Sequence, residues 1–147
     1  HRAPVPRIED LVRSRIECQL LDGVPYLVNS LESLAIKHGC KPVIEAKGKL
    51  SGYFAQHITF QIPVHFRSNS QSISYSVTCE LQVATSLGTL VWENSHNVYE
   101  LSRVKHERPE EWQWNPRDPR FLSRQLGHMI HLADGLFCLL RYEVKQK

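Results

Sequence analysis

The chain has 147 residues, of which 41% are hydrophobic and 22% are charged, and its formal net charge is +3. This length and composition are typical of one globular domain, and no apolar run approaches the roughly 18 residues that would suggest a membrane span. Four cysteines, Cys18, Cys40, Cys79 and Cys138, follow no zinc-binding spacing and favour a reduced, intracellular setting.

The first third of the chain predicts a strand, a helix and a second strand. Residues 15–20 form a short β-prone run. Asp22 is then an expected N-cap, because apolar residues follow at helical spacing over 24–35 and Gly39 closes the helix. Residues 41–46 form the next predicted strand.

Two runs of alternating apolar residues predict a β-hairpin. The runs cover residues 58–66 and 73–83, and the turn-rich segment 67–72 separates them. Because successive side chains of a strand point to opposite faces, one polar row is expected opposite the apolar row of the second run. That row contains Ser74, Ser76, Thr78, Glu80 and Gln82.

The last part of the chain predicts two helices. The first covers residues 87–101, and the second begins with Asp118 as N-cap and Pro119 as its first residue. The buried side of the second is expected to be Phe121, Leu122, Leu126, Met129, Ile130, Ala133, Leu136, Phe137 and Leu140. The order β-α-β-β-β-α-α predicts an α+β fold, with a mixed sheet of about four to five strands and helices packed on it.

Acidic and basic residues lie close together around the first predicted strand. Asp10 precedes the first strand, and Arg13 and Arg15 follow it closely. Mg²⁺ takes one or two carboxylates and leaves the remaining positions to phosphates, and arginine forks match phosphate oxygens. Glu80 and Gln82, on one strand face, are able to position a metal or accept a proton from a hydroxyl. The alternatives are a salt-bridge cluster for the first group and a solvated strand face for the second.

Aromatic and histidine side chains supply candidate contacts to a base. In the segment Gly52–His57, tyrosine at position 53 offers a flat face, although an aromatic residue at a strand start also serves as packing. Trp92, His96 and Tyr99 share one helical face, with the edge of the core as the alternative. His128 and His131 have no third ligand at a diagnostic spacing, so we expect no metal there.

Together these segments resemble the synthetase domain of the RelA/SpoT alarmone synthetases. That family carries Asp-Leu-x-Gly-x-Arg-Ile, then Gly-Tyr-x-x-x-His, then Glu-x-Gln-x-Arg-Thr and a Trp-x-x-x-His-x-x-Tyr-Lys helix. The counterparts in this sequence read DLVRSRI, GYFAQH, ELQVAT and WENSHNVYE, in the same order, over residues 8–100. The resemblance implies a nucleotidyltransferase-like fold and transfer of pyrophosphate from ATP to a ribose 3′-hydroxyl.

The resemblance also implies roles for individual residues. Asp10 and Glu80 would be catalytic and would bind Mg²⁺, with Glu80 holding the metal or acting as general base. Arg13 and Arg15 would contact phosphates. The acceptor would lie against the side chains of Tyr53, His57, Gln82, His96 and Tyr99.

Three departures bear on the acceptor. Ala84 and Glu100 stand where the family has basic residues that would face the 5′-phosphates of the acceptor, which weakens the case for GDP or GTP. Arg13 replaces the usual glycine. The DLVRSRI and GYFAQH forms look more like the toxic small alarmone synthetases, bacterial growth inhibitors whose members make adenosine alarmones or pyrophosphorylate the 3′ end of tRNA.

The expected organisation is a single synthetase domain over residues 1–147. The donor-binding Arg and Lys residues of the family lie upstream of the magnesium aspartate, and only nine residues precede Asp10 here, so that segment is expected to be missing. A toxin of this kind would act in the cytoplasm, with delivery from another cell as one route, and an antitoxin or immunity protein would neutralise it. No membrane association is expected. The alternative is a degenerate, non-catalytic domain that binds nucleotide or RNA or serves for docking.

Overall fold

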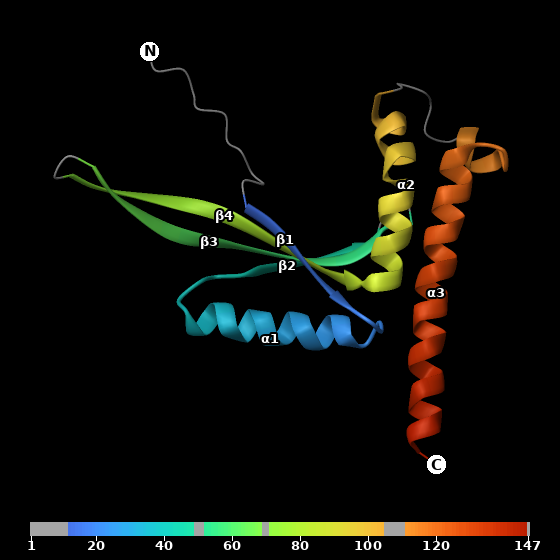
Figure 1. Ribbon diagram of the computed structural model, residues 1–147, viewed down its shortest axis with the longest axis horizontal. Coiled ribbons are helices and arrows are strands. Elements are labelled where there is room, and N and C mark those ends of the chain that lie inside the picture. The colour runs from blue at the N-terminus through green and yellow to red at the C-terminus, as the bar shows by residue number, and fades with distance from the viewer. Residues whose placement is uncertain (1–11, 49–51, 69–70, 105–110, 147) are drawn as a thin grey trace.

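A computed structural model describes residues 12–48, 52–68, 71–104 and 111–146 (Figure 1). It confirms the α+β class and the mixed sheet, which has four strands. In chain order the elements are β1 (Val12–Cys18), α1 (Gly23–Lys37), β2 (Val43–Gly48), β3 (Phe54–Ser68), β4 (Gln71–Thr85), α2 (Ser86–Val104), the short 3₁₀ helix η1 (Glu111–Trp114) and α3 (Pro119–Lys145).

The sheet has the order β1-β4-β3-β2, with β1 parallel to β4 and the other pairs antiparallel. The β3–β4 hairpin is confirmed, but its strands run further than predicted and leave little of the expected turn. Its outer half extends beyond the other strands (Figure 1). The pairing of β2 with β3 goes no further than Thr59, and the pairing of β1 with β4 begins at Cys79. The apolar side chains of Ile62 and Tyr75 are exposed on this two-stranded ribbon.

The main core lies between α1 and one face of the sheet. Val24 and Val28 of α1 meet Ile58 of β3 and Val83 of β4, and all four are buried. The helical spacing in α1 and the alternation in the hairpin explain why these side chains point toward one another. Full burial of each such side chain contributes about 1.5–3 kcal/mol, so this cluster is what holds α1 on the sheet.

Asp22 occupies the N-cap position of α1 as predicted, but its side chain does not cap the helix. The carboxylate instead accepts hydrogen bonds from the Tyr142 hydroxyl at 2.8 Å and from the Arg141 guanidinium, both on α3. A charge-assisted bond to a guanidinium is stronger than a bond to a backbone N–H, which explains this choice of partner. Asp22 therefore ties the β1–α1 loop to α3. Gly39, at φ 76°, follows the end of α1 as predicted.

Helix α3 lies beside α2 at one end of the sheet (Figure 1). Asp118 caps it as predicted, accepting the Arg120 N–H at 2.8 Å, and Pro119 is its first residue. The predicted buried side of α3 is wrong, because Gly127, Asp134 and Cys138 are the buried residues. Six of the residues expected inside are 48–65% exposed, namely Leu122, Leu126, Met129, Leu136, Phe137 and Leu140.

The reason for this difference is a close backbone contact between α3 and the start of β3. A Cβ atom on Gly127 would lie 2.3 Å from the Gly52 carbonyl oxygen, and one on Gly52 would lie 2.7 Å from the Arg124 carbonyl oxygen. Gly52 also has a φ of 83°, which L side chains rarely adopt. Two glycines therefore set the packing distance, and the small-residue side of α3 faces the sheet while larger apolar side chains point outward.

All four cysteines are free thiols; Cys79 and Cys138 are buried, and Cys18 and Cys40 are partly buried. Within the described ranges, no helix combines the length and the apolar character that crossing a bilayer requires.

Candidate active site

The candidate site is a polar patch on the face of the sheet opposite α1. Two cross-strand rows build it: Arg13 pairs with Glu80, and Arg15 pairs with Gln82, which also pairs with His57. Because side chains alternate along each strand, these five residues project from the same face. Register across the sheet thus brings together residues that lie far apart in the sequence.

Glu80 is the centre of the patch. Its Oε1 accepts from Arg13 Nε at 2.9 Å and from Gln82 Nε2 at 2.8 Å, and its Oε2 lies 3.3 Å from His57 Nδ1. The side chain is only 15% exposed. Burial by itself would raise the pKa of Glu80, but the hydrogen bond from Gln82, the contact with His57 and the positive charge of Arg13 outweigh it, so the pKa lies below its ordinary value. Glu80 is therefore ionised at neutral pH.

His57 links Glu80 to Tyr53. The Tyr53 hydroxyl lies 3.0 Å from His57 Nε2, while Nδ1 faces Glu80. These partners fit the Nδ1–H tautomer, in which the ring donates to the carboxylate and accepts from the phenol. Burial raises the pKa of Tyr53, and nearby Arg15 only partly offsets this, so the phenol keeps its proton and remains a donor. Glu80, His57 and Tyr53 thus form one hydrogen-bonded chain.

Helix α2 closes one side of the patch. The Trp92 ring lies 4.6 Å from that of Tyr53, tilted by 46°, and 5.5 Å from that of His96. Glu93 accepts from Arg15 Nη1 at 2.7 Å. Tyr53, at 8% exposure, is packed between α2 and the small side chains of the sheet, Ala55 and Ala84. The aromatic residue predicted to contact a base is therefore also a core residue.

The structure brings together most of the side chains that the sequence singled out. Arg13, Arg15, Tyr53, His57, Glu80 and Gln82 are in mutual contact through the pairs above, and His96 joins them through Trp92. Asp10 lies outside the described residues, as does the side chain of Tyr99. Their predicted roles, like those of the other candidate site residues, stay predictions.

Lys47 is a residue that the sequence reading missed. It pairs in register with Ala55, one row beyond Gln82 and His57, and its ammonium group forms an ion pair with Glu45. The side chains of Lys47 and Glu45 lie on the face of the polar patch, because Glu45 pairs with His57 and side chains alternate along each strand. The strand predicted from the sequence ended at residue 46, whereas β2 continues to Gly48, and the face that each residue takes depends on strand register.

The donor set at Glu80 fits a magnesium ion bound mainly by phosphates. Among the described residues, no three His, Cys, Asp or Glu side chains gather into a metal site. Mg²⁺ often uses one or two protein carboxylates and takes its other ligands from phosphates and water. Oε2 of Glu80, whose contact with His57 at 3.3 Å is the longest of the three, is the oxygen best placed to serve.

Comparison with known proteins finds similarity at the level of structure. No protein-family model and no curated protein sequence matches the chain. Small alarmone synthetase 2 from Bacillus subtilis superposes with a TM-score of 0.69 at 18% identity, over 97% of this chain and 71% of that one. Small alarmone synthetase 1 from the same organism gives 0.68 at 19% identity, over 95% and 66%.

The second enzyme also matches in two bound forms. Its structure with the product pppGpp gives a TM-score of 0.67 at 19% identity, and its structure with AMPCPP gives 0.56 at 16%. These cover 95% and 96% of this chain, and 64% of each neighbour's chain. At such identities the likeness establishes the architecture, and the fold of this chain is that of the small alarmone synthetases.

Proposed function

We propose that this chain is an ATP-dependent pyrophosphotransferase that moves the β,γ-diphosphate of ATP to a ribose 3′-hydroxyl and makes alarmones of the (p)ppGpp or (p)ppApp type. The observation that carries the proposal is the ionised Glu80, held between Arg13, His57 and Gln82 on the fold of such synthetases. Neighbours bound to pppGpp and AMPCPP are consistent with a nucleotide product and an ATP donor.

The reaction forms a bond between the acceptor 3′-oxygen and the β-phosphorus of ATP and breaks the bond from that phosphorus to the oxygen bridging to the α-phosphorus. AMP leaves, and the proton of the 3′-hydroxyl is released to water. Such transfers depend mainly on positioning and neutralisation of charge. A bound Mg²⁺ would supply part of that neutralisation. Asp10 and Oε2 of Glu80 are the proposed ligands of the metal.

The lowered pKa of Glu80 bears on its role. A general base works best when its pKa lies near the operating pH, and Glu80 is shifted away from that range. The carboxylate is better suited to orienting the 3′-hydroxyl and holding the metal than to full proton removal. We therefore propose Glu80 as an orienting and metal-binding residue, with His57 and Tyr53 fixing its position through the hydrogen bonds described above.

Basic residues around Glu80 are the proposed phosphate contacts. Arg13 is half exposed and points into the patch, and Arg15 is accessible but paired with Glu93. Lys47 adds a cation that the family motifs do not include, on the same face. The proposed acceptor cleft is completed by Gln82, His96 and Tyr99. The small part of the Tyr53 ring that Trp92 leaves exposed also belongs to it.

The proposal includes two further acceptors, an adenine nucleotide and the 3′ end of tRNA, and a role as a toxin. All three rest on the sequence motifs. Ala84 lies buried beside Tyr53, where the family has an arginine, so no cation from that position reaches an acceptor 5′-phosphate. This favours an acceptor that is not bound through such phosphates, which the 3′ end of tRNA satisfies. A toxin would act in the cytoplasm and require a neutralising protein partner.

The test uses full-length protein, Mg²⁺ and ATP labelled at the β- or γ-phosphate, with GDP, GTP, AMP, ADP, ATP and bulk tRNA as separate acceptors. Label should move to one acceptor class. In Glu80→Gln the rate should fall by at least about a hundredfold while circular dichroism is unchanged. Glu143→Gln, an exposed residue on α3, is the matched control and should keep full activity. Transfer to no acceptor by the folded protein would leave a non-catalytic binding or docking domain.

A further inference from the structure

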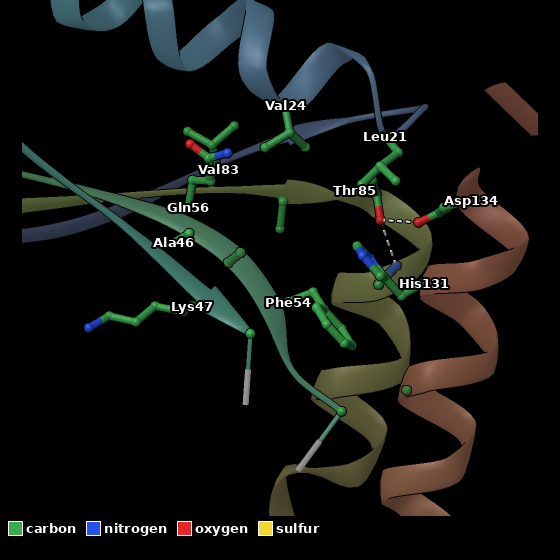
Figure 2. Close-up of a pocket in the computed structure, with 16 residues that line it drawn as sticks. Leu21, Val24, Ala46, Lys47, Phe54, Gln56, Val83, Thr85, His131 and Asp134 are labelled. Atoms are coloured by element: carbon green, nitrogen blue, oxygen red, sulfur yellow. Dashed lines mark hydrogen bonds between the residues drawn. The ribbon is translucent and has the colours of Figure 1, made fainter. Parts of the chain in front are cut away.

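A cavity lies on the α1 side of the sheet, behind the polar patch. It has a volume of about 240 Å³ and opens between the start of α1, the paired ends of β2 and β3, and α3 (Figure 2). Gln56, Val83 and Ala46 line it from the strand face that packs on α1, and Lys47, Ala55 and Ala84 of the other face border it as well. Glu80 is not a lining residue, and the cavity lies on the α1 side of the sheet (Figure 2). Its volume is below the 300–1,000 Å³ of typical drug-sized sites and suits a molecule of one or two rings.

Most of the cavity wall is apolar. Leu21 and Val24 contribute from the start of α1, Val83 from the sheet, and Phe54 from the opposite side (Figure 2). The Phe54 ring is itself fixed, because the His131 ring stacks on it at 3.9 Å with an interplanar angle of 4°. Lys47 points away from the cavity in Figure 2, so its ammonium group does not neutralise the interior.

The remaining wall is polar and contains a buried carboxylate. Asp134 of α3 is only 2% exposed and accepts a hydrogen bond from the Thr85 hydroxyl. The Thr85 oxygen also accepts a hydrogen bond from the Gly88 N–H at 3.1 Å, so this side chain is held in place by the start of α2. Within the described part of the chain, Thr85 is the hydrogen-bond partner of Asp134. One neutral donor is a sparse set for a buried carboxylate, whose oxygens accept up to about four hydrogen bonds.

His131 adds a second polar group with unused capacity. Among the described residues its ring nitrogens form no hydrogen bond, although the ring lines the cavity one helical turn from Asp134. Burial lowers the pKa of His131, so the ring is neutral at pH 7 and offers one donor and one acceptor nitrogen. A buried acceptor group and an imidazole thus meet on one wall of a mostly apolar space, with the Gln56 amide on another side.

We propose that this cavity binds a small planar heterocycle with adjacent N–H donors, its rings between Val24 and Phe54 and its N–H edge on the Asp134 carboxylate. Two parallel N–H groups match the two oxygens of a carboxylate, as in bidentate pairing. The apolar walls provide affinity, and the wall that contains Asp134 and His131 selects molecules by their donor edge. The proposal does not depend on the activity proposed for the opposite face.

The experiment measures binding to the full chain by isothermal titration calorimetry with two probes of equal size. 2-Aminobenzimidazole presents adjacent N–H donors, and 2-methylbenzimidazole replaces the amino group with a methyl group. We expect wild-type protein to bind the amino probe at least about tenfold more tightly, and Asp134→Asn to lose that preference. Glu80→Gln, on the opposite face, should bind as wild type does.

Asp134 is buried, so a variant that spares it keeps the test valid if Asp134→Asn fails to fold. Ala46→Trp places a bulky ring at the cavity mouth on β2, an edge strand where an aromatic side chain is tolerated. This variant should fold and lose binding of the amino probe. Three results would each overturn the proposal: no binding to folded wild type at millimolar probe, equal affinity for both probes, or binding that survives in Ala46→Trp.

Discussion

At the scale of single residues, Glu80 shows how a partly buried carboxylate is kept charged. It has lost most of its water, yet three polar groups converge on its two oxygens, one from each of three strands. A group paired in this way stabilises the folded state only while it is ionised. The same contacts that would orient a substrate therefore also couple the stability of the sheet to pH.

The first prediction is a pH dependence that belongs to Glu80. Its folded pKa lies below the ordinary value, so its contribution to stability is present above the unfolded pKa and is lost as pH falls through the folded pKa. The free energy of unfolding of wild type should exceed that of Glu80→Gln most clearly near pH 7. Urea titrations from pH 7 to pH 3 should show this difference shrinking below about pH 4.5. A difference independent of pH would mean that Glu80 is not held ionised.

Tyr53 gives a second prediction at this scale, because its ring and its hydroxyl have separate contacts. Tyr53→Phe removes the hydrogen bond to His57 and should cost about 0.5–1.5 kcal/mol of unfolding free energy. Tyr53→Ala also removes the packing on Trp92 and should cost about 3–5 kcal/mol. Urea unfolding measures both. Equal costs in the two variants would show that the ring packs against little.

At the scale of elements, α3 is located by its smallest residues. Gly127 meets Gly52, and Asp134 and Cys138 are the other buried positions, whereas a line of leucines faces outward. Since Gly52 precedes Tyr53 directly, the C-terminal helix holds the strand end that carries one of the candidate site residues. The position of Tyr53 thus depends on a helix that supplies no side chain to the polar patch.

The third prediction compares two glycines of this helix. Alanine normally stabilises a helix by about 1 kcal/mol relative to glycine. In Gly127→Ala the new Cβ would lie 2.3 Å from the Gly52 carbonyl oxygen, so we expect a loss of more than about 2 kcal/mol. In Gly135→Ala the nearest atom is Leu21 Cδ2 at 3.9 Å, so this control should be neutral or stabilising. Thermal unfolding distinguishes them, and equal effects would contradict the proposed packing.

Local sequence patterns predicted some elements of this fold and not others. The hairpin and α1 were predictable because alternation and helical spacing are local, and the Asp118 cap was predictable from its neighbour Pro119. The buried side of α3 was not, because an apolar stripe does not say whether a neighbouring element covers it. The face of the sheet on which Lys47 lies was not predictable either, since it depends on the pairing of Lys47 with Ala55 of β3.

At the scale of the whole molecule, the sheet separates two polar regions. One contains Glu80 and the basic residues, and the other contains Asp134 and His131 behind the sheet. Strand β3 and the residue before it contribute to both, with Tyr53 and His57 on one face and Phe54 and Gln56 on the other. A ligand in the rear cavity would therefore contact the strand that positions the candidate site.

The fourth prediction concerns the pH stability of the whole fold near neutrality. Burial lowers the pKa of His131, Asp134 opposes this shift and His128 adds to it. The unfolded chain, with an ordinary histidine pKa near 6.5, then binds a proton more readily than the folded chain. Stability should fall as pH drops from about 7.5 to 5.5. His131→Phe, which keeps a ring stacked on Phe54, should show a smaller fall in urea titrations, and identical falls would refute the assignment to His131.

The parallel pairing of β1 with β4 has a consequence for how the protein is made. The Cys18 thiol donates to the Ala84 carbonyl oxygen across 66 positions, and Arg13 meets Glu80 over a similar separation. A ribosome adds about 5–20 residues per second, so β1 leaves the exit tunnel several seconds before its partner strand. Arg13 and Arg15 therefore wait without their acidic and amide partners during that interval. The candidate site is assembled only after the hairpin has been synthesised.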